Sequence, residues 1–372
     1  MGKGSEEKMN KTVTRRNKKK QLSSLISNII FCLIALTALT GCIVLVLQNY
    51  SLQNEGREVM SRLEEHELEF IYTQEDLDAY LAENALRERE DERNSFLEEI
   101  KRRVSSGEST VSLLRSFFPQ DVVVYADGGY SFFPISETLK KHEYVYENFV
   151  KQENEEIIYV DEERNIRSVK GIDVSKHQGE IEWDKVAEDG VSYAFIRAGY
   201  RGSSEGKLIE DEFFVDNMEG AAENDVDIGI YFYTQAMTPK EAKEEAEFVI
   251  ELIEPYDVDY PVVLDLEETE SASARTAEMT KEEFTKVAIA FCETIKEAGY
   301  TPMIYGNLKT FMIMLDLEQI EDYEKWFAYY DETVYFPYAF NIWQYSSKGS
   351  IAGIKGDVDL NICMKDYTQE NE

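Results

Sequence analysis

From about residue 170 onward, short apolar segments rich in β-branched and aromatic residues alternate with longer amphipathic segments. The apolar segments have strand character. The amphipathic segments between the first five of them have helical periodicity. Such alternation predicts a parallel sheet covered by helices, and eight strands in series predict a barrel. The predicted strands are GIDVS, YAFIRAGY, IGIYFYT, PVVLDLE, TPMIYGN, KWFAYY, NIWQYS and VDLNIC.

The predicted barrel covers residues 170–372 and is irregular, because the last three strands follow one another too closely for full helices between them. Three helices are expected between the earlier strands. They lie in the segments DEFFVDNMEGAAENDV, TPKEAKEEAEFVIELIEPY and TKEEFTKVAIAFCETIKEAG. The fold class is therefore α/β, a TIM-like barrel preceded by other segments.

The N-terminal region predicts a membrane anchor. Residues 1–20 hold eight Lys/Arg against two Glu, and the apolar residues 22–47 follow without a charge. A helix of that length extends about 39 Å, enough to cross a hydrocarbon core of about 30 Å. The basic segment in front favours a cytoplasmic N-terminus, a single pass through the cell membrane and an extracellular catalytic domain. A lipidated Cys42 in the segment LTGC is the less favoured alternative, since IVLVL continues the apolar run.

Two further segments separate the anchor from the barrel. Residues 53–108 are highly charged with an irregular apolar stripe, which predicts a helical stalk that is compatible with a homodimer but lacks a sustained heptad. Residues 109–169 predict a small α+β module of unknown role. Its expected parts are a hairpin around Asp127-Gly128-Gly129 and then a helix in ETLKKHEYVYENFV.

Composition excludes several classes of function. The formal net charge is −35, and the basic residues 1–20 leave the rest more negative still, which argues against a nucleic-acid partner. Only three histidines, scattered along the chain, argue against a metal site or a catalytic triad, and no cofactor is expected. Four cysteines do not form a disulfide scaffold, although a single bond between Cys292 and Cys363 is left open.

Four carboxylates are expected at the end of the barrel where active sites gather. Asp173 lies in GIDVS, Asp265 and Glu267 in VVLDLEE, and Asp359 in GDVDLN. Asp265 and Glu267 are two residues apart on one strand, so both side chains point to the same face. Neighbouring carboxylates repel, which predicts that at least one stays protonated near neutral pH and can act as a general acid in glycosidic bond cleavage.

Aromatic residues gather near the same predicted strand ends, where flat rings suit sugar faces. Some of them are expected to be barrel packing instead. The set is Tyr200, Tyr231, Tyr233, Tyr305, Trp326, Tyr329, Trp343 and Tyr345.

The blocks GIDVSKHQG, YAFIRAGY, VDIGIYFYT, PVVLDLE, MIYGN, WFAYY, IWQYSS and GDVDLN occur in order over about residues 170–367. In this the chain resembles the glycoside hydrolase family 25 lysozymes (muramidases). The resemblance implies an irregular barrel and hydrolysis of the β-1,4 bond between N-acetylmuramic acid and N-acetylglucosamine in peptidoglycan. It leaves residues 1–169 without an explanation.

Carried over by position, the resemblance makes Glu267 the proton donor, Asp265 its partner carboxylate, and Asp173 and Asp359 further acidic residues of the cleft. It also implies substrate contacts. The expected substrate-binding residues are Tyr200, Tyr231, Tyr233, Tyr305, Trp343 and Gln344. In YFYT, Phe232 stands where many members carry His, which puts one local contact in doubt.

Several alternatives stay open on the sequence alone. A same-strand pair of carboxylates fits a retaining or an inverting mechanism, and Asp265 could instead orient the acetamido group of the sugar as the nucleophile. A protein that holds glycan without cleaving it is the main alternative function. A glycosidase acting on another N-acetylated polysaccharide, such as chitin, is the weaker one.

Overall fold

The computed structural model of the chain describes residues 36, 38–61, 73–269, 271 and 273–367. The chain divides into two compact units, residues 1–98 and 99–372. In the first unit, residues 38–61 are helical and α2 (Gln74–Ser105) begins, without burying any side chain. Among the helices of the described ranges, none is long and apolar enough to cross a bilayer. Much of the predicted anchor, residues 22–35 and 37, lies outside those ranges.

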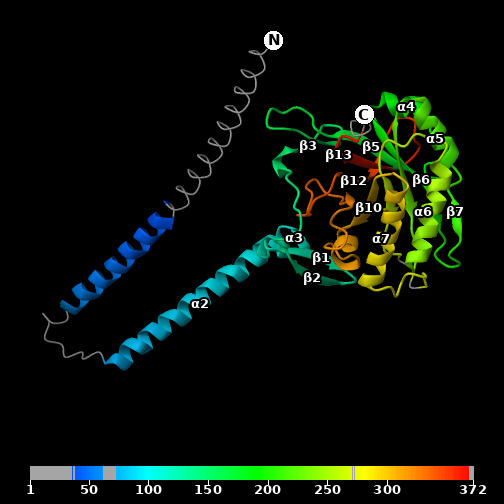
Figure 1. The fold of residues 1–372 in the computed structure, drawn as a ribbon. Coiled ribbons are helices and arrows are strands. Elements are labelled where there is room, and N and C mark those ends of the chain that lie inside the picture. The colour runs from blue at the N-terminus through cyan, green and yellow to red at the C-terminus, as the bar shows by residue number, and fades with distance from the viewer. Residues whose placement is uncertain (1–35, 37, 62–72, 270, 272, 368–372) are drawn as a thin grey trace, which may run out of the picture. The chain divides into compact units, whose positions relative to one another are not determined.

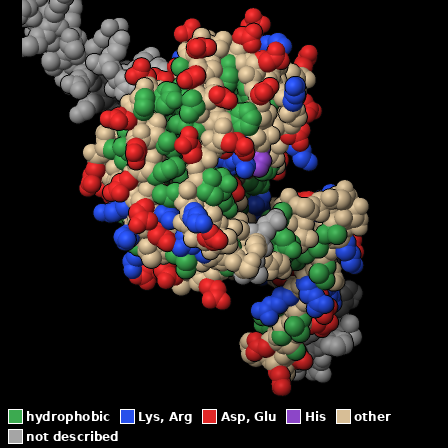
Figure 2. Space-filling model, turned by 90° about the vertical axis from the view of Figure 1, so that its right-hand side faces the viewer, with side chains coloured by type: hydrophobic (Ala, Val, Ile, Leu, Met, Phe, Trp, Pro, Cys, Tyr) green, Lys and Arg blue, Asp and Glu red, His purple; other side chains and the backbone are tan. Residues whose placement is uncertain are grey.

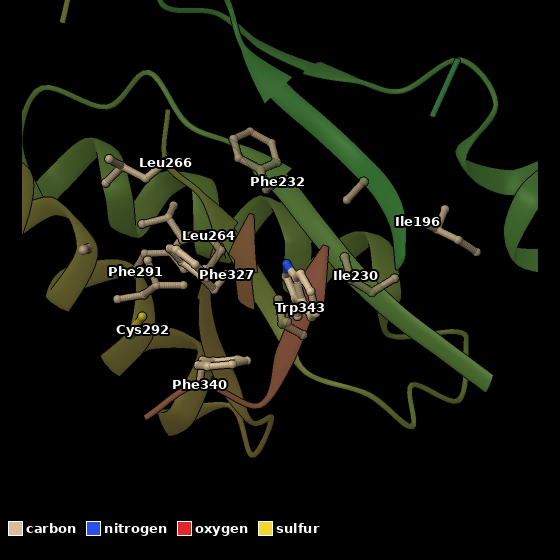
Figure 3. Packing of buried hydrophobic residues seen from close by; sticks show 14 of the residues in the cluster. Ile196, Ile230, Phe232, Leu264, Leu266, Phe291, Cys292, Phe327, Phe340 and Trp343 are labelled. Atoms are coloured by element: carbon tan, nitrogen blue, oxygen red, sulfur yellow. The ribbon is translucent and has the colours of Figure 1, made fainter. Parts of the chain in front are cut away.

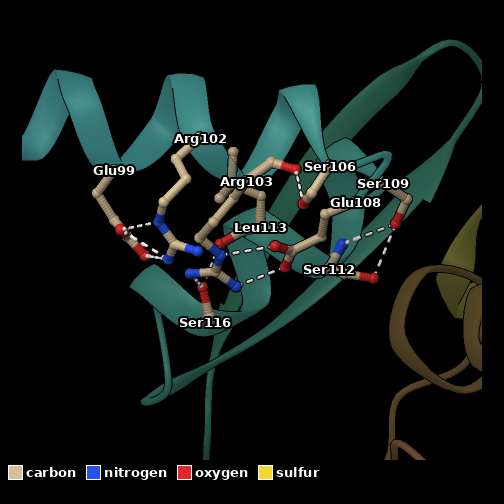
Figure 4. A network of polar contacts seen from close by, with 9 residues as sticks. All are labelled: Glu99, Arg102, Arg103, Ser106, Glu108, Ser109, Ser112, Leu113 and Ser116. Atoms are coloured by element: carbon tan, nitrogen blue, oxygen red, sulfur yellow. Dashed lines mark hydrogen bonds and ion pairs between the residues drawn. The ribbon is translucent and has the colours of Figure 1, made fainter.

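The second unit begins in the last turns of α2, where polar contacts connect α2 to α3 (Thr110–Phe117) (Figure 4). The Arg103 guanidinium donates to Glu108 at 2.6 Å and to the Ser116 hydroxyl at 2.7 Å. The Ser109 hydroxyl accepts from the Ser112 backbone N–H, which caps α3. The direction of the chain changes between two helices that are held by these side chains.

A closed sheet forms the centre of the second unit (Figure 1). Each of the eight predicted strands is present, and β5 pairs with both β6 and β13, which closes the barrel. The strands are β5 (Val169–Val174), β6 (Tyr193–Arg201), β8 (Asp227–Tyr233), β9 (Val262–Asp265), β10 (Pro302–Asn307), β11 (Glu324–Ala328), β12 (Ile342–Gly349) and β13 (Val358–Cys363). The prediction of an α/β barrel is confirmed.

The prediction of a wholly parallel sheet is wrong at β13, which runs antiparallel to both β12 and β5. The segment between β12 and β13 turns through Gly353 and Gly356, both at φ near +92°. It is too short for a crossover helix, so the chain must return in the opposite direction. An additional short strand, β7 (Leu208–Glu210), pairs antiparallel with β6.

The three predicted helices cover β6, β8, β9 and β10 from outside. They are α5 (Phe214–Glu223), α6 (Pro239–Ile253) and α7 (Lys281–Glu297), and a short α4 (Trp183–Glu188) precedes them. Thr280 and Glu283 form a capping box at α7, and Thr238 caps α6 with Pro239 in its first turn. On the side where these helices lie, acidic side chains are spread over the surface (Figure 2). A five-residue π-helical turn, Thr310–Met314, follows β10.

Two apolar layers hold the barrel together. One fills its interior with aromatic rings, among them Phe195 stacked on Trp326 at 4.4 Å between ring centroids. The other lies between the sheet and its outer cover, and Leu264, Phe232 and Phe291 of α7 belong to it (Figure 3). Alternate residues of each strand supply the two layers, as the period of a strand requires.

The module before the barrel contains a hairpin, as predicted. Strands β1 (Asp121–Ala126) and β2 (Gly129–Pro134) pair in register, and Asp127 and Gly128 turn between them with positive φ. The helix predicted for residues 137–150 is wrong. Those residues form an extended segment, a short 3₁₀ turn (Tyr146–Asn148) and strand β3 (Phe149–Lys151), which pairs with β4 (Ile157–Tyr159).

The physical reason is tertiary packing against the connection between β11 and β12, residues 329–341. The Tyr144 hydroxyl donates to the Phe340 carbonyl at 2.9 Å, and the Ala339 N–H donates to the Lys140 carbonyl at 2.9 Å. Val122, Val124 and Ile157 of the module belong to the same buried cluster as the outer layer of the barrel. The module therefore covers the sheet where no helix separates β11 from β12 in the described chain.

Candidate active site

Asp173 lies near the end of β5 and is buried, with 8% of its surface exposed. Its Oδ2 accepts hydrogen bonds from the Gln344 and Asn361 side-chain amides, each at 2.8 Å. The strand approaches closely to its neighbour here, since a Cβ on Gly171 would lie 2.1 Å from the Tyr193 ring. The glycine of the block GIDVS therefore allows the packing that positions Asp173.

Asp265 ends β9, and Glu267 follows two residues later. Leu264 and Leu266 point into the outer layer, so the alternation of the strand turns Asp265 to the interior. Asp265 is 8% exposed, and its Oδ1 has no hydrogen-bond partner among the described residues. The register places Asp265 between Tyr233 of β8 and Tyr305 of β10.

Asp359 reaches the same end of the barrel by a different route from the one predicted. It is the second residue of β13, not a residue at the C-terminal end of a parallel strand, and it lies opposite Asp173 in the register. The reversed direction of β13 is what brings it there. All four predicted carboxylates thus lie at one mouth of the barrel.

Burial raises the pKa of each carboxyl, and for the three aspartates the charges of neighbouring carboxylates add to it. For Asp265, burial acts first and the charges of Glu267 and Asp173 add to it. Burial and the charge of Asp359 raise the pKa of Asp173, and burial and the charge of Glu267 raise the pKa of Asp359 to about 6. Burial also raises the pKa of Glu267, and the neighbouring Tyr305 hydroxyl acts against this rise. The group is therefore suited to keep protons near neutral pH.

A hydrogen-bonded network positions Asp173. The Tyr305 and Tyr330 hydroxyls both donate to the Gln344 Oε1 at 2.8 Å, while the amide of Gln344 donates to Asp173. Asn361 carries a similar relay, since its Oδ1 accepts from the Trp326 ring N–H at 2.8 Å. The structure places Tyr305 and Gln344 beside Asp173, and their contact with a substrate stays a prediction.

The other predicted substrate-binding residues divide into two groups. Tyr233 lies near Asp265 and Glu267, whose charges raise the pKa of its hydroxyl in addition to burial, and Tyr200 is next to Tyr233 in the register. Tyr231 is buried in the barrel interior, 8% exposed, close to Asp173 and Asp265.

Trp343 is not brought to the carboxylates. It is fully buried in the outer layer, where its ring meets Phe149 of the module edge to face at 5.2 Å and its N–H donates to the Tyr329 carbonyl. Phe232 likewise points outward and packs against Phe248 of α6. The contact that its substitution put in doubt therefore lies outside the group of carboxylates.

Sequence reasoning missed three residues of the site. Asn361 could have been found, because it stands two residues after Asp359 on the same strand and must share its face. Arg197 on β6, whose charge lowers the pKa of Asp265 against the effect of burial, is held by Asp211 at 2.7 Å, a contact that no local motif reveals. Tyr330 lies in an irregular connection, where no periodicity identifies its direction.

The described part of the chain contains no group of three or more His, Cys, Asp or Glu side chains arranged to hold a metal ion. Cys292 and Cys363 are both buried free thiols, Cys292 in the outer layer and Cys363 inside the barrel. The disulfide that the sequence left open is not formed.

Two hollows lie among the segments that follow the strands, and the four carboxylates line neither of them. The first, of about 650 Å³, lies between the β3–β4 hairpin, the segment after β11 and the end of β12, with Tyr330 at its edge. The second, of about 590 Å³, lies between the β1–β2 turn and the segments after β9 and β10. Both hairpins of the module therefore reach the rim of the mouth.

The arrangement provides what glycosidic bond cleavage needs. A protonated carboxyl can donate to the leaving oxygen, and a second carboxyl can stabilise positive charge on the sugar ring or activate a nucleophile. Gln344 and Asn361 hold the Asp173 carboxyl in place and Tyr305 holds Gln344, so little reorganisation of this group is required during the reaction.

Comparison with known proteins gives a consistent result. Residues 172–354 match the model of the glycosyl hydrolases family 25. Protein YegX of Escherichia coli K12 is 29% identical over 204 residues, which cover 52% of this chain and 69% of YegX. The autolytic lysozyme of Clostridium acetobutylicum is 27% identical over 194 residues, covering 52% of this chain and 55% of that protein.

Among solved structures, the chain is similar to the modular autolysin LytC from Streptococcus pneumoniae, which was solved in complex with a synthetic peptidoglycan ligand. The TM-score is 0.50 and the identity 25%, over 64% of this chain. The chain spans only 57% of the LytC structure. The match extends beyond the segment that the family model covers.

Proposed function

Because the chain belongs to the glycosyl hydrolases family 25 through residues 172–354, we propose that it is a muramidase that cleaves the β-1,4 bond between N-acetylmuramic acid and N-acetylglucosamine in peptidoglycan. Membership of the family confirms the predicted enzyme class, a glycoside hydrolase. The bond, the residues that cleave it and the site of action in the cell are the proposal.

The observation that carries the proposal is the group of four carboxyls at one mouth of the barrel, each with a raised pKa. Glu267 is the general acid. It is less enclosed than Asp265, which suits contact with the leaving oxygen, and burial raises its pKa so that it stays protonated. Activity should therefore fall as the pH rises above the pKa of Glu267.

Asp265 is the supporting carboxylate. Its Oδ1 has no partner among the described residues, so it is available to a substrate group. Asp173 and Asp359 line the cleft, and the amides of Gln344 and Asn361 keep Asp173 in place. Tyr200, Tyr231, Tyr233 and Tyr305 provide aromatic and hydroxyl groups around the carboxylates.

The decisive experiment compares wild type with Glu267→Gln on purified peptidoglycan and follows the release of reducing ends. Removing the proton donor should lower kcat by roughly 10²–10⁴-fold. Glu268→Gln is the matched control, because Glu268 is exposed and pairs with Lys309 away from the cluster. Equal activity of wild type and Glu267→Gln would contradict the assignment.

The same assay separates the alternatives. Retained glycan binding without new reducing ends would favour a scaffold protein, and faster cleavage of chitin than of peptidoglycan would favour another N-acetylated substrate. Mass spectrometry of the products identifies which bond was cut.

We also propose that residues 22–47 anchor the chain in the cell membrane, with the basic residues 1–20 in the cytoplasm and the barrel outside. The negative charge of the chain should be repelled by an anionic wall, so a tether would supply a high local concentration of enzyme. A homodimer through α2 stays a prediction. Unchanged wall turnover in cells after deletion of residues 1–50 would contradict the tethering proposal.

A further inference from the structure

The hollow of about 650 Å³ that Tyr330 lines is built partly by residues outside the family domain. The β3–β4 hairpin supplies one wall, and the segment after β11 and the end of β12 supply the others. Lys151 of the hairpin contacts Glu332 at 3.0 Å, which joins two of these walls. The volume of the hollow is within the usual size range of ligand sites.

Tyr330 connects this hollow to the reaction centre. It lines the hollow, and its hydroxyl donates to the Gln344 Oε1 at 2.8 Å, while Gln344 holds Asp173. Burial raises the pKa of the Tyr330 hydroxyl, and the charges of Asp359, Asp173 and Glu267 add to this rise. Tyr330 therefore belongs both to the wall of the hollow and to the network that holds Asp173.

Several charged side chains of the hollow already form ion pairs with neighbouring side chains. Lys151 is balanced by Glu332 and by Glu155 at 3.7 Å, and Glu156 is balanced by Lys170 at 2.6 Å. Asp331 and the exposed Lys348 remain, and neither has an ion-pair partner among the described residues. Because one ammonium group, Lys151, is shared by two carboxylates, the hollow offers at least one carboxylate, that of Asp331, and one ammonium group, that of Lys348, to a ligand.

We propose that this hollow binds the peptide carried by the muramic acid residue next to the cleaved bond. This deepens the proposed function and rests on it. In peptidoglycan each muramic acid can carry a short peptide on its lactyl group, and that peptide must leave the cleft beside the reacting sugar. Such peptides hold carboxylates and, at a diamino acid, an ammonium group, which complement Lys348 and Asp331. A neutral sugar would make no use of this pair.

A short peptide extends far from its lactyl group, since an extended chain covers about 3.3–3.6 Å per residue and two or three residues span roughly 10 Å. Tyr330 lines the hollow, and the serine hydroxyls at the end of β12 offer hydrogen bonds there.

The test uses the full chain and two substrates, linear glycan strands with their peptides and the same strands after an amidase has removed them. Lys348→Glu should lower the ratio of kcat/KM on peptide-bearing to peptide-free strands roughly fivefold, mainly through KM. Lys355→Glu, an exposed lysine outside the hollow, makes the same charge change and should leave the ratio as in wild type. Melting temperatures check that both variants are folded.

An unchanged ratio for Lys348→Glu, with wild type cleaving both substrates, would overturn this inference and leave the proposed function standing. An equal loss on both substrates would make the hollow a sugar site and also overturn it. Cleavage of neither substrate by wild type would overturn the proposed function, and this inference with it.

Discussion

The two sides of the barrel are covered in different ways. Over β8, β9 and β10 the cover consists of α6 and α7, each inserted between consecutive strands as in any β/α series. Over β11 and β12 it comes from residues 109–169, which precede the barrel in the chain. One side is thus covered by helices that lie between its own strands in the chain, and the other by a segment about 200 residues away. Only this second cover brings residues from outside the segment that matches the family model, 172–354, to the mouth.

The test with the largest expected effect removes the module, residues 109–169, that covers β11 and β12. The fragment 170–372 should fail to fold, because it exposes the surface that buries Val122, Val124 and Ile157. Each such side chain contributes about 1.5–3 kcal/mol, and their sum approaches the total stability of a typical domain, about 5–15 kcal/mol. Circular dichroism and solubility measure the result, and the fragment 99–372 is the control. A stable, cooperatively folded 170–372 fragment would make the module dispensable.

Single substitutions compare the two covers directly. Phe291→Ala on α7 should lower the free energy of unfolding by about 3–5 kcal/mol, and Val122→Ala on β1 by about 2 kcal/mol. Both should shift a single cooperative transition in urea, since both side chains belong to one buried cluster. A separate early transition in Val122→Ala alone would show that the module unfolds independently.

The pH dependence of stability tests the carboxylates on β5 and β13. Burial and Glu267 raise the pKa of Asp359 from 3.8 to about 6, so the folded chain keeps a proton that the unfolded chain releases between these values. The carboxyl therefore destabilises the fold above pH 6 and not below about 3.8. Asp359→Asn should raise the free energy of unfolding by about 1–3 kcal/mol at pH 7 and leave it unchanged near pH 4, as measured by urea unfolding.

Asp257→Asn, in an exposed segment, is the control for that series and should have no such pH dependence. A gain in Asp359→Asn that stayed constant from pH 4 to pH 7 would contradict the electrostatic explanation.

The smallest effect is expected at the rim, where Lys309 contacts Asp127 of the module at 2.6 Å and Glu268 at 2.5 Å. Asp127 is largely exposed, so Asp127→Asn should lower the free energy of unfolding by less than about 1 kcal/mol. Asparagine also tolerates the positive φ of the turn. High salt should remove the difference from wild type in the same unfolding assay. A larger, salt-independent loss would mean that this contact, not the buried cluster, holds the module.

The sequence predicted the parts of this molecule that depend on local periodicity. The helices and strands of the barrel, the Asp127-Gly128 turn and the shared face of Asp265 and Glu267 follow from spacing and turn chemistry alone. The direction of β13 did not follow, because a strand has the same pattern in either direction. Trp343 was expected at the site since an aromatic residue on a strand fits either face. Its neighbour Gln344 points to Asp173, so the alternation excludes Trp343 from that face.

The segment 137–150 could not be predicted locally. Tyr144 and its neighbours have an amphipathic pattern that also fits a helix, and the partners that keep them extended, Tyr338 and Phe340, lie far along the chain. Arg197 was missed for a related reason, since its importance comes from Asp211 and Asp265 on other elements.

The reversed direction of β13 has a practical consequence. Cys363 is paired with Val169 at the start of β5, so the chain leaves the barrel at the end opposite the carboxylates. Tyr367 continues there against Tyr260, which precedes β9. A fluorescent reporter or an immobilisation tag attached beyond Tyr367 would therefore stand clear of an incoming glycan strand, so the enzyme can be fixed to a surface with its mouth facing the solution.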